Sequence, residues 1–86
     1  MPIVSNFYGI LIYFYFREHN PPHFHAKYNE FEAIVDIKTL GVTEGKLPKK
    51  AQSLVIEWAI EHQEELMANW ELCQNQMPPN KIEPLN

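Results

Sequence analysis

The stretch from His23 to Lys38 constrains the fold more than any other part of this chain. It reads as two strands, 23–28 and 31–38, around an Asn29-Glu30 turn, since asparagine tolerates left-handed backbone geometry. A two-residue turn there puts only apolar pairs on one side: Tyr28 with Phe31, Ala26 with Ala33, and Phe24 with Val35. The other side pairs Lys27 with Glu32, His25 with Ile34, and His23 with Asp36. A slip of one residue would mix the two sets, so the sequence predicts this register.

Two further segments carry clear periodic or compositional signals. The run Phe7–Phe16 is aromatic and β-branched, which favours one continuous strand. Beyond Pro48, which suits the first turn of a helix, apolar side chains recur at helical spacing. They are Leu54, Val55, Trp58, Ala59, His62, Leu66 and Trp70. The spacing predicts one helix over 48–76, about 40 Å long at 1.5 Å per residue, which must protrude, bend or meet a partner.

These elements predict an α+β fold. We expect an antiparallel sheet of three to four strands, including the β-hairpin at 23–38, with one long amphipathic helix across one face. A short strand at 40–43 would be the fourth. The 86 residues predict a single domain over 1–86: a sheet at 1–38, the helix at 48–76, and an extended C-terminal tail at 77–86. Ile82 and Leu85 of the tail are expected to pack back onto the domain.

Charge and cysteine content narrow the function classes. The net charge is −4 with only seven Lys and Arg, which argues against nucleic-acid binding as the main role. The single cysteine, Cys73, excludes an intrachain disulfide and a cysteine-rich zinc site. The N-terminus lacks a signal-peptide pattern, and the longest apolar run is about half a bilayer span. We therefore expect a cytoplasmic protein with no membrane contact.

The ionisable chemistry is concentrated in His19-Asn20-Pro21-Pro22-His23-Phe24-His25-Ala26, where three of the four histidines fall within seven residues. His23 and His25 are one residue apart on a predicted strand, so both imidazoles project from one face. Such a pair can ligate a divalent transition metal such as zinc, with His19 as a third ligand. Glu18, Glu32 or Asp36 could supply a carboxylate, and Asp36 could instead orient His23.

Two other interpretations of the same residues stay open. His23 and His25, with Asp36 as the orienting carboxylate, could catalyse metal-free acid–base chemistry. RNA cleavage would fit, because the 2′-hydroxyl is its own nucleophile. Alternatively the histidines only build the fold: His19 caps the turn, His23 pairs with Asp36, and His25 packs edge-on against Tyr13 or Tyr15. His62, on the apolar helix stripe, is expected to be a core residue rather than a ligand.

Four segments together carry a family resemblance: Phe7-Tyr8-Gly9, the 19–26 motif, Glu57-Trp58, and Lys81-Ile82-Glu83-Pro84-Leu85. With them, the chain from Pro2 to Leu85 resembles the small bacterial domain of unknown function 4160 family. The resemblance implies a second small protein encoded beside this one, in an arrangement similar to toxin–antitoxin pairs. It implies no catalytic residues.

We therefore expect a protein of toxin–antitoxin or regulatory type that binds a protein partner, encoded nearby, or a second copy of itself. The second apolar sheet face or a protruding helix would make the contact, with the histidine face as the functional surface. The alternative is an enzyme working through the histidines and Asp36, either metal-dependent or a metal-free ribonuclease.

Overall fold

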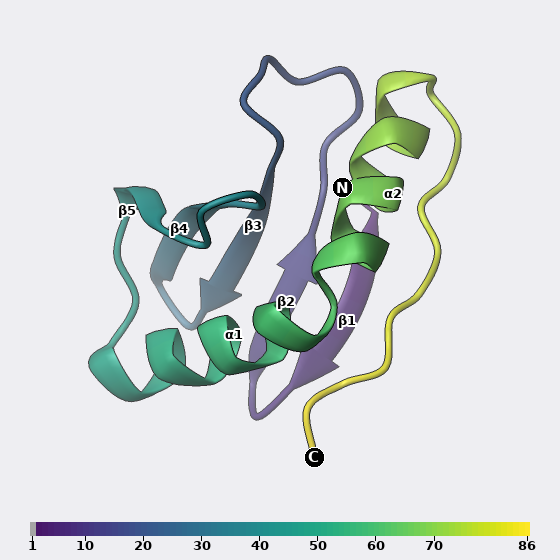
Figure 1. The fold of residues 1–86 in the computed structure, drawn as a ribbon. Coiled ribbons are helices and arrows are strands. Elements are labelled where there is room, and N and C mark those ends of the chain that lie inside the picture. The colour runs from purple at the N-terminus through teal and green to yellow at the C-terminus, as the bar shows by residue number, and fades with distance from the viewer. Residues whose placement is uncertain (1) are drawn as a thin grey trace.

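Five antiparallel strands form one sheet in chain order (Figure 1). The computed structural model describes residues 2–86. The strands are β1 (Ile3–Phe7), β2 (Ile10–Tyr13), β3 (His23–Tyr28), β4 (Phe31–Asp36) and β5 (Val42–Gly45). The α+β class is confirmed, whereas the expected count of three to four strands is wrong.

The count differs because the run Phe7–Phe16, expected to be one continuous strand, is interrupted between β1 and β2. Tyr8 and Gly9 both have positive φ, at 52° and 79°, and Phe7 pairs with Ile10. Two consecutive positive φ values give the turn that matches the twist of a two-residue hairpin. The turn ends β1 at Phe7, inside what the aromatic composition suggested was one strand.

The β3–β4 hairpin has the predicted register at all six pairs, from His23 opposite Asp36 to Tyr28 opposite Phe31. Asn29 has a φ of 54°, as the turn requires. The second strand ends at Asp36 rather than Lys38, because the chain turns there and the Asp36 carbonyl accepts the Leu40 amide at 2.8 Å. A short strand does follow, at 42–45 rather than the expected 40–43.

The single long helix predicted for 48–76 is wrong. The structure has α1 (Lys49–Glu61) and α2 (Gln63–Gln74), separated at His62, whose φ and ψ are −122° and 22°. The domain is 33 Å in its longest dimension, so a straight helix of about 40 Å would leave apolar residues in water. The break instead keeps the stripe on the core, and neither helix protrudes.

The Gln63 side chain fixes the start of α2 to the turn that follows β4. Its amide donates to the carbonyl oxygens of Ile37, at 2.7 Å, and Lys38, at 3.1 Å. At the other end, the amides of Gln76 and Met77 bond back to the Cys73 and Leu72 carbonyls, and Gln76 has a φ of 59°. These bonds form a left-handed C-terminal cap, which ends the helix just before the Pro78-Pro79 pair.

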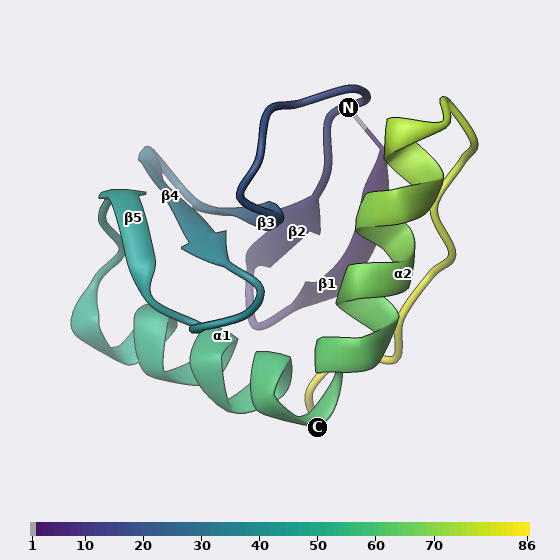
Figure 2. The same ribbon diagram turned by 45° about the horizontal axis from the view of Figure 1, so that its top comes forward.

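One face of the sheet carries the core, and both helices pack on it (Figure 2). Trp58 of α1 is fully buried, with its ring 5.3 Å from that of Phe7 and 6.1 Å from that of Phe24. The core residues of β2, β3 and β4 follow the apolar register set. They are Ile10, Ile12, Phe24, Ala26, Ala33 and Val35.

The C-terminal tail closes the β1 side of the molecule, next to α2 (Figure 1). The Ile82 amide donates to the Val4 carbonyl at 2.8 Å, and the Trp58 indole donates to the Glu83 carbonyl at 2.7 Å. Ile82 is buried and Leu85 packs against the core, as the sequence predicted. Within residues 2–86, no helix is both long and apolar enough to cross a membrane.

Candidate functional site

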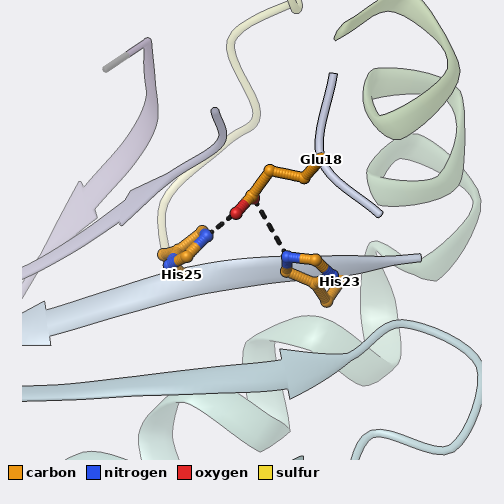
Figure 3. Close-up of side chains that lie close together, drawn as sticks. All are labelled: Glu18, His23 and His25. Carbon is orange, nitrogen blue, oxygen red and sulfur yellow. Dashed lines mark hydrogen bonds and ion pairs between the residues drawn. The ribbon is translucent and has the colours of Figure 1, made fainter. Parts of the chain in front are cut away.

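β3 places His23 and His25 on the side of the sheet opposite the core residues Phe24 and Ala26. Alternation along the strand produces this arrangement, as the sequence predicted. Figure 3 shows the two imidazoles projecting from the same side of the strand towards Glu18. His25 is buried and His23 is partly buried.

Glu18, on the loop between β2 and β3, brings the two histidines together. Its Oε1 lies 2.8 Å from His25 Nε2 and 3.0 Å from His23 Nε2 (Figure 3). The three potential ligand atoms all lie within 4.8 Å of one another. We call Glu18, His23 and His25 the histidine–glutamate cluster. Among the three carboxylates that the sequence offered, the structure brings Glu18 to the histidines.

Asp36 is opposite His23 in the ladder, but its carboxylate points elsewhere. Asp36 Oδ1 accepts hydrogen bonds from the Lys38 amide, at 2.8 Å, and the Thr39 amide, at 3.0 Å. An aspartate at a strand end commonly bonds the free amides that follow it. The expected His23–Asp36 hydrogen bond is therefore absent from the described bonds, and Glu18 takes that position.

His19, the expected third ligand, is exposed and lies outside the cluster. It lines a groove of about 460 Å³ next to the cluster. The groove is formed by Glu18, His19, Asn20, Pro21, His23, Ile34, Asp36, Thr43 and Glu44. His19 and Asp36 are thus neighbours of the cluster through the groove.

Two tyrosines fix the ring of His25. The Tyr13 ring stacks on it, with centroids 5.1 Å apart and planes at 15°, while Tyr15 meets it edge-on at 4.8 Å. The Tyr13 hydroxyl donates to a carboxylate oxygen of Glu32. Burial, and then this bond to Glu32, raise the pKa of Tyr13 well above its ordinary value. Glu32 therefore serves Tyr13 and not the histidines.

The Pro21 carbonyl and the Trp70 ring hold the side chain of His23. Its Nδ1 is 2.8 Å from the Pro21 carbonyl oxygen, and its ring lies 4.9 Å from that of Trp70 on α2. A carbonyl only accepts, so His23 Nδ1 carries the proton. Trp70 is 47 positions away in the sequence, and only the packing of α2 brings it here.

The end of α2 also positions Glu18. The Gln74 side-chain amide donates to the Glu18 carbonyl at 3.0 Å, and the Arg17 amide donates to the Cys73 carbonyl at 3.3 Å. Arg17 itself has a φ of 58°, which redirects the loop immediately before Glu18. No short-range signal in the sequence pointed to Gln74.

Sequence comparison identifies the chain's family. The family described as Domain of unknown function (DUF4160) matches residues 9–71, more than half of the chain. The chain belongs to the DUF4160 family. No curated protein and no solved structure matches it.

The DUF4160 match contains the whole histidine–glutamate cluster, Pro21 and Trp70, and it ends before Gln74. His62, the fourth histidine, lies apart from the cluster on the helical side. Its Nδ1 bonds the Glu65 carboxylate, and its ring is 5.3 Å from that of Trp58. His62 was expected to be a core residue, but it is partly buried at the edge of the core beside Trp58.

Proposed function

We propose that this DUF4160 protein is a small regulatory protein, of the kind found in toxin–antitoxin pairs, that binds a protein partner through the sheet face carrying the histidines. The observation that supports this is the one-sided packing of the sheet. Both helices pack on the core side, and α2 reaches His23 through Trp70, but no helix residue within 2–86 lines the two hollows on the histidine side.

The histidine side has two adjacent hollows. Besides the groove next to the cluster, a second hollow of about 370 Å³ is lined by Tyr15, His25, Glu32, Ala33, Ile34, Glu44 and Gly45. The two share Ile34 and Glu44. Tyr15, which is 40% exposed, adds apolar contact area to the second hollow. Together they offer a partner a continuous concave surface.

The charges of this surface favour a basic partner. Four carboxylates line the two hollows, from Glu18, Glu32, Asp36 and Glu44, and no Lys or Arg lines either one. Complementary charge gives an interface specificity and speeds association. We therefore propose a protein partner that presents a basic segment. Two copies of this acidic face would repel each other, which disfavours self-association through it.

The test uses the second small protein that we expect to be encoded beside this one, with binding measured by calorimetry. Glu44→Lys and Tyr15→Lys should each weaken binding by at least tenfold, since both positions are exposed on the histidine side. Glu57→Lys and Glu61→Lys, exposed on α1, match the charge change of Glu44→Lys and should bind normally. Equal weakening by all four variants would refute this face. Dimers of the isolated chain that Tyr15→Lys dissociates would show that the partner is a second copy.

One observation supports the alternative, an enzyme. A carboxylate bonded to both imidazoles is the arrangement that orients a histidine for acid–base chemistry. The working set would be His23 and His25 with Glu18, either with a metal or as a metal-free ribonuclease. The expressed protein should then cleave cellular RNA or another substrate. His25→Ala should abolish this cleavage, whereas His62→Ala should not. Intact RNA during growth arrest would contradict the ribonuclease.

A further inference from the structure

The clearest unassigned feature is the meeting of three donor atoms at one point. Glu18 Oε1 is 2.8 Å from His25 Nε2 and 3.0 Å from His23 Nε2. Donor atoms around a tetrahedral ion lie about 3.3 Å apart when each is about 2 Å from the metal. The two oxygen–nitrogen separations would need to open by a few tenths of an ångström to admit such an ion, and the two ring nitrogens, which lie within 4.8 Å of each other, would take up the same spacing.

The position of the proton on His23 decides which ring nitrogen can bind an ion. His23 Nδ1 donates to the Pro21 carbonyl, so a neutral ring presents the lone pair of Nε2. His23 Nε2 faces Glu18 Oε1 at 3.0 Å, so a neutral ring directs this lone pair to the point where an ion would lie. Metal-bound histidines typically donate their other ring hydrogen to a carbonyl in this manner.

We propose that the histidine–glutamate cluster is a binding site for one divalent transition-metal ion, with Glu18 Oε1, His23 Nε2 and His25 Nε2 as its protein ligands. Two imidazoles and a carboxylate favour zinc, cobalt, nickel or iron(II) over calcium and magnesium, which prefer oxygen ligands alone. This site goes beyond the proposed partner binding and does not depend on it.

The ligands are held in place before any ion binds. Tyr13 and Tyr15 fix the His25 ring from its face and its edge, and Trp70 packs against His23. Gln74 and the Cys73 carbonyl hold the backbone that carries Glu18. A site whose ligands are preorganised by their surroundings loses less entropy on binding.

Three protein ligands leave one position of a tetrahedral ion open. Both Glu18 and His23 line the acidic groove, so that position is accessible from the groove that also contains His19 and Asp36. Three ligands with an open position are typical of zinc sites that bind water or a small ligand, whereas structural sites are closed by four. A water or a donor atom of a bound molecule would complete the coordination.

The test is a titration of chelator-treated, tag-free protein with Co²⁺ and Zn²⁺. We expect one ion per chain, with visible absorption bands of tetrahedral cobalt that Zn²⁺ removes. Glu18→Gln, His23→Gln and His25→Gln should each weaken binding by at least tenfold, the range seen when metal surroundings are altered. His62→Gln, a histidine outside the cluster, should leave the affinity unchanged.

Circular dichroism of each variant shows whether the fold is kept, which matters most for the buried His25. Glu18→Gln is a conservative change that tests the same site at a less buried residue. The proposal is overturned if binding is not stoichiometric, or if Glu18→Gln binds like the natural chain. It is also overturned if His19→Gln weakens binding as much as His25→Gln does, because the ligands would then be the three histidines of the sequence motif.

Discussion

The Gln74 side-chain amide donates a hydrogen bond to the backbone carbonyl of Glu18 at 3.0 Å, although the two residues are 56 positions apart. This bond connects the last turn of α2 to the loop that carries a carboxylate of the histidine–glutamate cluster. The geometry of the cluster therefore depends on helix packing as well as on the local motif.

Gln74→Ala should weaken Co²⁺ binding by roughly tenfold, the lower end of the effect of residues that orient metal ligands. The physical reason is that the Glu18 backbone loses its anchor while the three ligands themselves remain. Asn75→Ala is the matched control, because the Asn75 side chain bonds only the Glu71 carbonyl of its own helix. Equal cobalt affinities for the two variants would contradict a positioning role for Gln74.

Gly45→Ala should lower the free energy of unfolding by about 1–3 kcal/mol, the usual cost of strained backbone geometry. Gly45 has a φ of 70°, and an added Cβ would lie 2.2 Å from the Glu32 carbonyl oxygen. Gly41→Ala is the control, since its Cβ would meet only Thr39 Oγ1 at 3.4 Å. Urea denaturation gives the free energy of unfolding of both variants. Similar losses in the two would argue against the close approach of β5 to β4 at Gly45.

Tyr13 makes the stability of the fold sensitive to alkaline pH. Its pKa is raised above the ordinary value of 10.0, so the unfolded chain loses this proton before the folded one does. The stability from Tyr13 is complete below about pH 10 and is lost as the pH rises from there towards the folded-state pKa. Denaturation from pH 9.5 to 11.5 should show a shallower decline for Tyr13→Phe than for the natural chain.

The control for that experiment is Tyr8→Phe at an exposed position, which should keep the natural slope. Tyr13→Phe should also cost about 0.5–1.5 kcal/mol near neutral pH, because it removes the hydrogen bond to Glu32. A natural slope in Tyr13→Phe would mean that other groups cause the alkaline loss.

Cys73 should resist thiol reagents in the folded protein. It is fully buried, and burial together with the Glu18 charge raises the pKa of its thiol, which lowers the thiolate fraction. Labelling should be slower by roughly a thousandfold than in denaturant, since reaction requires opening of the fold. Rapid labelling of the native protein would indicate that the end of α2 opens readily, and Glu18 with it.

The β3–β4 hairpin was predictable because its information is local. Alternation assigns each residue to a face, and the Asn29 turn fixes which residues are opposite each other, so all six pairs follow from the sequence. The same reasoning missed the Tyr8-Gly9 turn, because strong strand propensity on both sides hid it. A glycine between two aromatic, β-branched segments was the available signal.

The position of the helix break and the Asp36 contact were missed for different reasons. The length of the pattern showed that a straight helix would be too long for the domain and would protrude, bend or meet a partner, but helical periodicity continues through His62 and does not mark the break there. Register gives the backbone partner of Asp36 but not the direction of its side chain, which bonds the Lys38 and Thr39 amides.

The sequence by itself determined the family. It also determined the hairpin and the common face of His23 and His25, because strand periodicity and a short turn act over a few residues. Only the tertiary structure decided which carboxylate joins those histidines. Asp36 is directly opposite His23 and Glu18 is on a loop, yet packing of α2 against that loop brings Glu18 to both rings. Asp36 turns away to the amides that follow it in the chain, whereas the placement of the Glu18 loop depends on contacts with the distant end of α2, which local patterns do not encode.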